Sequence, residues 1–219
     1  GTRLYVANRG GSNVSVVDLG REKEVSRIIV REQRMNDRPQ DIALSVGGYG
    51  LIATTPNGRM MELSLADETS VWRRDFGFFG YATSTYLTAS GDRSVIVISD
   101  SADIYRYDGV ARTFTLSPEH EYQTAWAQAV NRDGSVILIG THQSQMYVLD
   151  KNLEAIGTLP SYAGGVALNT RGDLAYLAVD DRVEVYLLPE SQLMGTLMLP
   201  DQLSRFSEYS PGVGSMSLS

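Results

Sequence analysis

Few residues of this chain could carry out acid–base chemistry or bind a metal ion. The candidates for acid–base chemistry are two histidines, His120 and His142, and the carboxylates Asp41 and Glu121. Such groups can transfer protons in a hydrolase or lyase, so if the chain is an enzyme we expect Asp41, His142 and Glu121 to be catalytic. A catalytic zinc site typically takes three protein ligands, so the histidines would need a carboxylate such as Glu119 or Glu121 beside them.

Asp41 allows three interpretations, because Arg38 stands shortly before it in the sequence. The carboxylate could act as a base, ligate a metal or form an ion pair with Arg38, and we favour the ion pair. A glycoside-cleaving mechanism would require a second acid facing the first. The positions that match Asp41 in the later repeats of the chain are Ser84, Ala127, Gly165 and Ser215. None of them is an acid, which disfavours that mechanism.

Four aspartates could hold Ca²⁺ through their oxygens: Asp100, Asp103, Asp180 and Asp181. They lack the regular ligand spacing of a calcium loop, and we interpret them as solvated turn residues. The sequence contains no Gly-x-Ser-x-Gly elbow, phosphate-binding loop or dinucleotide fingerprint. We therefore expect no cofactor.

Aromatic residues give the densest indication of ligand binding. Flat aromatic faces beside polar groups suit a sugar ring, a cyclic small molecule or a peptide, although large side chains also fill the space between sheets. Both interpretations stay open. The predicted ligand-binding residues are Phe78, Phe79, Tyr81, Tyr122, Trp126, Tyr162, Arg38 and Asn8.

Composition excludes several classes of function. The net charge of −7 disfavours nucleic-acid binding and docking on an anionic membrane. No run of about 18 apolar residues is present, so we expect no membrane insertion. The absence of cysteine excludes disulfides and thiolate sites. Because the sequence begins at Gly1 without Met, we expect a processed or excised chain.

Short β-strands must position these residues. Residues 4–7 and 14–17 are rich in β-branched and aromatic side chains, and the Asn, Gly and Ser residues between them suit a tight turn. The pattern of strand, turn glycine and strand recurs along the chain. The aligned glycines are Gly1, Gly48, Gly91, Gly134 and Gly172. Units of four antiparallel strands repeated about every 40 residues predict the blades of a β-propeller.

The ends of the chain predict how the propeller closes. The first unit lacks a first strand, and residues 211–219 could supply it, which would leave no unpaired sheet edge. We therefore predict one all-β domain, a five-bladed propeller whose C-terminal strand (211–219) joins the N-terminal strands (1–30). The predicted blades cover residues 211–219 with 1–30, 38–76, 79–116, 124–159 and 162–199.

Residues 4–8, Leu-Tyr-Val-Ala-Asn, followed by residues 13–18, Asn-Val-Ser-Val-Val-Asp, resemble the YVTN type of β-propeller repeat. Residues 174–178 are a weaker copy. The repeat occurs in surface-layer proteins, lactonase-like enzymes and binding propellers, so the resemblance implies a fold rather than one activity. It also implies an extracellular or periplasmic location.

We expect a non-catalytic binding or scaffolding propeller that holds a small molecule, a carbohydrate or a peptide on its loop face. One alternative is a hydrolase or lyase acting on a lactone or glycan at the channel mouth. A second is a structural domain of an envelope or surface assembly.

Overall fold

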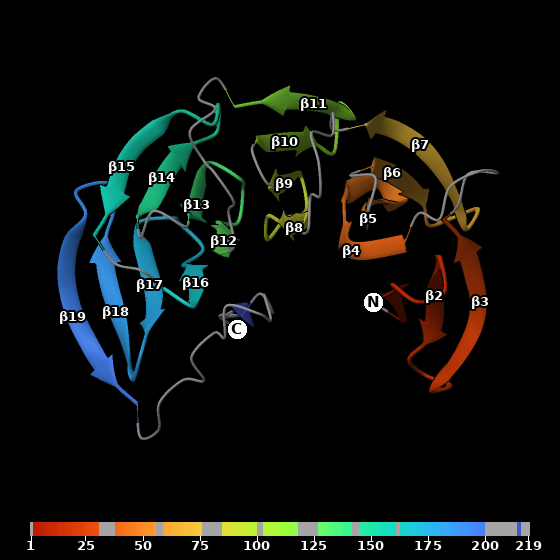
Figure 1. Cartoon of the computed structure of the whole chain (residues 1–219), viewed down its shortest axis with the longest axis horizontal. Helices are drawn as coiled ribbons and strands as arrows, with labels where there is room; N and C mark the ends of the chain where they lie inside the picture. Colours follow the sequence, from red (N-terminus) through yellow and green to blue (C-terminus); the bar gives the residue numbers. More distant parts are fainter. Residues whose placement is uncertain are drawn as a thin grey trace. The chain divides into compact units, whose positions relative to one another are not determined.

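The computed structural model describes residues 2–30, 38–55, 59–75, 85–99, 103–117, 127–141, 145–160, 163–199 and 214–215 (Figure 1). These segments form strands, turns and one short 3-10 helix, η1 (Val46–Gly48), so the prediction of an all-β chain is confirmed. The described part of the chain contains no helix long and apolar enough to cross a membrane.

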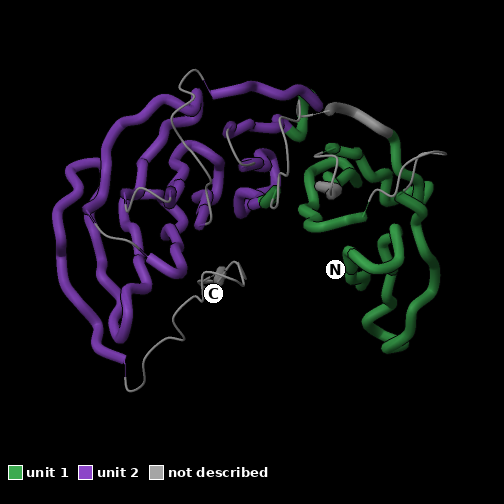
Figure 2. Tube along the Cα trace, viewed as in Figure 1, with its two compact units in different colours: residues 1–87, 109–111 green, residues 88–108, 112–219 purple. Residues whose placement is uncertain are grey.

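The chain divides into two compact units, and unit 1 comprises residues 1–87 and 109–111 (Figure 2). It contains two antiparallel sheets. Sheet 1 is formed by β1 (Arg3–Asn8), β2 (Asn13–Asp18) and β3 (Lys23–Ile29). Sheet 2 is formed by β4 (Arg38–Leu44), β5 (Tyr49–Thr55), β6 (Arg59–Ser64) and β7 (Thr69–Asp75).

Unit 2 comprises residues 88–108 and 112–219, so the boundary between the units falls inside β8. Sheet 3 is formed by β8 (Tyr86–Ala89), β9 (Val95–Ser99), β10 (Ile104–Asp108) and β11 (Thr113–Leu116). Sheet 4 is formed by β12 (Ala127–Val130), β13 (Val136–Gly140), β14 (Met146–Asp150) and β15 (Ala155–Leu159). Sheet 5 is formed by β16 (Gly165–Leu168), β17 (Leu174–Val179), β18 (Arg182–Leu187), β19 (Gln192–Met198) and β20 (Gly214–Ser215).

Hydrophobic cores lie between consecutive sheets within each unit. In unit 1, Val14 and Val16 of sheet 1 share a buried cluster with Ile52 and Leu63 of sheet 2. In unit 2, one cluster joins sheets 3 and 4, and another joins sheets 4 and 5. Successive side chains of a strand point to opposite faces, which lets the second strands be buried on both sides.

A β-bulge interrupts the pairing of the last two strands in four of the five described sheets, at a corresponding place in three of them and two residues earlier in sheet 2. The register shifts after Val16 in β2, Met60 in β6, Val148 in β14 and Val185 in β18. A bulge inserts one residue and increases the local twist. The repeated bulge is the structural counterpart of the repeat in the sequence.

The hydrogen bonds of the turn between the first two strands of sheet 3 show that the sequence alignment of the third repeat is shifted by two residues. The backbone N–H of Asn131 bonds to the carbonyl of Val136, and the matching donor in sheet 3 is Ser90, which bonds to Val95. The sequence alignment matches Gly91 with Gly134, whereas the residue at the Gly134 position is Arg93. Arg93 has a left-handed φ of 63°, close to the 73° of Gly134.

This correction also moves the residue that corresponds to Asp41. Ala127 stands four residues before Asn131, and the residue four positions before Ser90 is Tyr86. Tyr86, and not Ser84, is therefore the residue of the third repeat that corresponds to Asp41. The sequence alignment is wrong here because it assumes that glycine marks the left-handed position, while arginine occupies it in sheet 3.

The two described residues of the C-terminal segment, Gly214 and Ser215, form β20 and join sheet 5. They run parallel to β16, with Gly214 opposite Gly165 and Ser215 opposite Val166. Within the described residues, sheet 1 has three strands and β1 is paired only with β2. Ring closure by residues 211–219 therefore stays a prediction.

Candidate functional site

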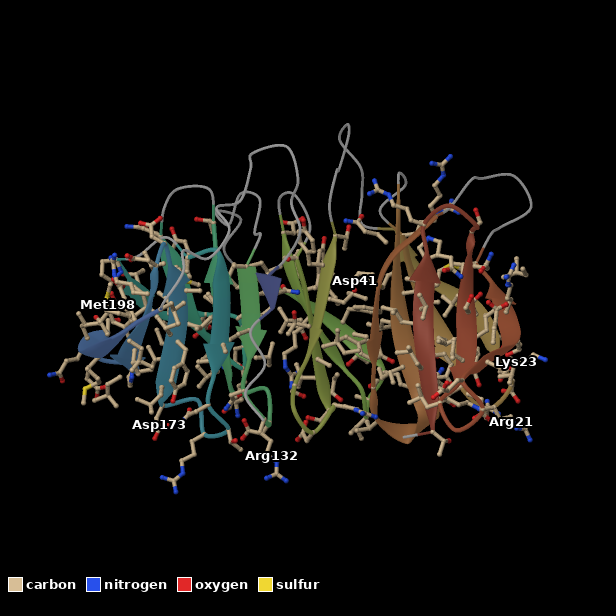
Figure 3. All side chains as sticks on the ribbon, turned by 90° about the horizontal axis from the view of Figure 1, so that it is seen from below. Arg21, Lys23, Asp41, Arg132, Asp173 and Met198 are labelled. Carbon is tan, nitrogen blue, oxygen red and sulfur yellow. The ribbon has the colours of Figure 1, made fainter. Side chains whose placement is uncertain are left out.

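The two ends of the sheets in unit 2 differ in their hydrogen bonding. One end, here the turn end, consists of the turns at residues 90–94, 131–135 and 169–173, and Figure 3 shows Arg132 and Asp173 together there. The opposite end, the loop end, is where β9 and β13 finish and β12 begins. β12 starts at the loop end, so its first residues lie close to that end. β9 finishes there, so its last residues do as well.

The turn end is tied together by direct bonds between neighbouring sheets. The backbone N–H of Asp92 donates to the carbonyl of Arg132 over 2.8 Å, and the N–H of Arg132 donates to Thr170 over 3.4 Å. The buried Asn131 side chain donates to the carbonyl of Arg171 over 3.2 Å and accepts from the N–H of Val136 over 3.0 Å. This end has its polar groups satisfied within the fold.

Carboxylates in these turns hold the backbone. Asp133 accepts from the hydroxyl and the N–H of Ser135, and these bonds lower the pKa of its carboxyl. The N–H and hydroxyl of Ser94 bind Asp92 in the same way and lower its pKa. Both aspartates therefore stabilise turns in the ionised form.

The loop end of unit 2 contains polar side chains that are buried without a partner. Gln128 in β12 is 7% exposed, and within the described segments both its amide oxygen and its amide nitrogen lack a hydrogen bond. Ser99, the last residue of β9, is 1% exposed, and its hydroxyl also lacks a bond within those segments. An unsatisfied buried polar group costs about 1–3 kcal/mol, so this arrangement needs an explanation.

Gln128 and Ser99 face the same layer between sheets 3 and 4. Gln128 stands two residues before Val130 and opposite Ile139, and both of these residues belong to the cluster that joins the two sheets. Ser99 stands opposite Ile104, which belongs to that cluster as well. By strand alternation, the amide and the hydroxyl point into one apolar layer from its two sides. They form the candidate binding site.

Sequence reasoning does not identify Gln128 as a functional residue. In the sequence it appears only as part of the repeat Gln-Ala-Val-Asn at residues 128–131. The signal that could have found it is its neighbours, because an amide between Ala127 and Ala129 in a short apolar strand is unusual for a core position.

Asp41, the predicted catalytic carboxylate, lies in unit 1 (Figure 3) and is bonded to the backbone of that unit. Its Oδ1 accepts from the N–H of Ile42 and its Oδ2 accepts from the N–H of Leu87, each over 2.8 Å. Burial raises the pKa of this half-buried carboxyl, and the two amide bonds oppose that rise. Both oxygens are therefore engaged in hydrogen bonds to backbone N–H groups.

The ion pair between Arg38 and Asp41 is not formed. Among the described residues, no ion pair joins Arg38 to a carboxylate, and its side chain is exposed. A bulge at Gln40 separates the two residues in the pairing of β4 with β5. The Gln40 Oε1 is buried without a hydrogen bond, so β4 also carries an unsatisfied amide oxygen near its start.

Asn8, a predicted ligand-binding residue, holds the turn between β1 and β2. Its Nδ2 donates to Asn13 Oδ1 over 2.8 Å and to the Ser15 hydroxyl over 2.7 Å. Ser15 donates to Glu24, whose pKa is lowered first by its bond with Arg27 and then by this one. Both amide hydrogens of Asn8 are therefore used within the fold.

The predicted metal ligands are only partly described. Asp103 accepts from the Tyr105 hydroxyl over 3.2 Å, and Asp180 and Asp181 form the turn before β18. Beyond that turn, buried Glu184 binds Arg182 and the Tyr186 hydroxyl. Within the segments that the structure describes, no group of three His, Asp or Glu residues could hold a metal ion.

The remaining predicted site residues lie outside the described residues. They are Phe78, Phe79, Tyr81, Asp100, Glu121, Tyr122, Trp126, His142 and Tyr162. By their place in the sequence, several belong to segments that adjoin the loop end: residues 100–102 follow Ser99, and residues 118–126 precede Ala127.

A scan of the sequence against models of protein families finds no match. A search of curated proteins finds no similar protein. The resemblance of residues 4–8 to the YVTN repeat therefore stays a prediction.

Proposed function

We propose that the five sheets are the blades of a five-bladed β-propeller closed by residues 211–219. Consecutive sheets pack face to face within each unit, as blades do. Inner strands of adjacent blades run parallel around a propeller axis, and β20 runs parallel to β16. Leu4 and Leu197 on the first and last sheets are 49% and 60% exposed, and closure would cover apolar residues of this kind.

Deleting residues 211–219 tests this closure. If the segment completes sheet 1, the deletion increases amide hydrogen exchange in β1 (Arg3–Asn8), because β1 loses a strand partner. The matched control replaces residues 211–219 with a Gly-Ser segment of equal length, which keeps the length of the chain. Increased exchange confined to β16 (Gly165–Leu168) would refute closure onto sheet 1.

We infer that the chain is a non-catalytic binding module whose ligand enters at the loop end. The observation that carries this inference is the buried Gln128 amide, which has no hydrogen-bond partner among the described residues. A ligand that supplies the missing hydrogen bonds would explain why a polar side chain is kept in an apolar layer. The engaged oxygens of Asp41 support binding rather than catalysis.

Thermal unfolding against sugars, lactones, short peptides, Ca²⁺ and Zn²⁺ tests the binding function. A ligand at 100 times its dissociation constant stabilises the fold by about 2.7 kcal/mol. Hydrogen exchange with the stabilising compound then locates the site. Protection at Ser99 and at residues 127–128 supports the proposal, whereas protection confined to the turn end contradicts it. No shift with any compound also contradicts it.

A further inference from the structure

We propose that the ligand is a neutral saccharide that inserts a pair of hydroxyl groups between sheets 3 and 4, where they bond to the Gln128 amide and the Ser99 hydroxyl. This inference rests on the binding function proposed above and names the chemical class of the ligand. Both residues are more than nine-tenths buried, and their polar side-chain atoms have no partner in the part of the chain that the structure describes.

The surroundings of Gln128 require an uncharged group. Ile139 and Ile104, which stand opposite Gln128 and Ser99 in their sheets, are completely buried. Burying a carboxylate, phosphate or ammonium among such residues costs far more than burying a hydroxyl, unless an opposite charge lies beside it. Arg106 shares this face of sheet 3 two residues beyond Ile104 along β10. It pairs with Asp108 over 3.7 Å, and its buried Nε has no hydrogen bond among the described residues, so an anion that reached this far into the layer would meet one cation.

The hydrogen-bonding groups of the site favour hydroxyls. The Gln128 amide offers two donors and an acceptor oxygen, and the Ser99 hydroxyl both donates and accepts. A hydroxyl can also do both and can rotate to suit either partner, so two neighbouring hydroxyls satisfy the amide nitrogen and oxygen together. Packed sheets are only about 10 Å apart, so we expect a small terminal group, and not a peptide main chain, to enter between them.

The position of the site determines how deep the ligand reaches. Ser99 is the last residue of β9, and Gln128 is the second residue of β12. Both therefore lie within two residues of a strand end at the loop end. An inserted hydroxyl pair reaches them while the rest of the sugar ring stays outside the sheets.

Titration calorimetry and ligand-observed NMR on the full chain test this proposal. The probes are glucose, galactose, mannose, N-acetylglucosamine and their disaccharides, with acetamide and a blocked asparagine dipeptide as amide competitors. The variants are Gln128→Met, which keeps the length of the side chain but removes the amide, and Ser99→Ala. Gln192→Met is the matched control, because Gln192 is exposed on β19 of the same unit.

We expect at least one saccharide to bind, with an association constant that Gln128→Met lowers about tenfold and Gln192→Met leaves within about twofold. Gln128→Met also raises the melting temperature by about 3–6 °C without ligand, since it removes unsatisfied buried atoms. Saccharide binding that is unchanged in Gln128→Met would overturn the proposal.

Two further outcomes would separate this inference from the binding function. If only the amide probes bind, and Gln128→Met abolishes that binding, the saccharide is wrong while the binding function stands. If no probe binds and Gln128→Met lowers the melting temperature, an internal water satisfies the amide, and both proposals fail.

Discussion

Replacing Gly134 by alanine probes the close packing of sheets 3 and 4 at the turn end. Gly134 has a left-handed φ of +73°. A Cβ at this position would lie 2.5 Å from Val95 Cγ2 and 2.7 Å from Val95 Cβ. Val95 is 1% exposed and belongs to the cluster between the sheets, so it has little room to move.

The expected loss has two parts. A left-handed backbone costs a residue with a Cβ about 1–2 kcal/mol, and overpacking a buried valine costs about 1–3 kcal/mol. Alanine also lowers the conformational entropy of the unfolded chain, and this effect stabilises the folded state by about 0.4–1 kcal/mol. We therefore expect Gly134→Ala to lower the free energy of unfolding by about 2–4 kcal/mol.

Two glycines in the same chain separate these contributions. Gly48 has a φ of +80°, and a Cβ added there would have no atom within 4 Å, so Gly48→Ala has the backbone cost alone. Gly195 has neither a positive φ nor a close neighbour, and Gly195→Ala in strand β19 should stabilise by about 0.5 kcal/mol.

Urea unfolding followed by fluorescence or circular dichroism measures all three variants. We expect Gly134→Ala to lose at least about 1 kcal/mol more than Gly48→Ala. A double mutant with Val95→Ala should recover part of this difference, because the smaller side chain makes room for the added methyl group. Equal losses for Gly134→Ala and Gly48→Ala would refute the close contact between Gly134 and Val95.

Single residues give three other predictions. Burial raises the pKa of Asp41, so the folded chain holds this proton more tightly than the unfolded chain, and stability from this site falls as the pH rises above about 4. Asp41→Asn should flatten this part of the pH–stability curve in urea titrations, and an unchanged slope would contradict the assignment. Asn131→Ala should cost about 2–4 kcal/mol in urea unfolding, because three side-chain hydrogen bonds of a buried residue are lost; exposed Asn152→Ala is its control. Arg93→Gly should stabilise by about 1 kcal/mol by relieving a left-handed φ, and a loss of stability in the same assay would show that its side-chain contacts matter more.

Strand positions are predictable because they depend on local sequence. The segments predicted at residues 4–7 and 14–17 correspond to β1 (Arg3–Asn8) and β2 (Asn13–Asp18). Each combines β-branched residues with a turn of Asn, Gly and Ser. The bounds differ by a single residue at each end, which reflects backbone pairing that continues past the apolar residues.

The hairpin turns before the outer strands are not predictable from glycine. At these positions non-glycine residues have left-handed φ values: Glu22, Glu68, Arg112, Leu153 and Ser191. The tertiary structure imposes this backbone and overrides the local preference. The same effect places Arg93 at a glycine position and shifts the alignment of the third repeat.

Whether a buried polar side chain in a strand is hydrogen-bonded depends on the donors and acceptors that the neighbouring sheet presents to it. Asn131 and Gln128 stand three residues apart in the sequence and are both buried, yet Asn131 bonds to Arg171 of the next repeat while Gln128 faces isoleucines. Their sequence neighbours do not distinguish them. Stability measurements do: removing the amide of Asn131 breaks bonds, whereas removing that of Gln128 or Gln40 removes unsatisfied atoms. Since a residue that lowers stability is expected to be kept for function, a methionine at Gln128 that raises stability would support a ligand-binding role for the loop end of unit 2 before any ligand is known.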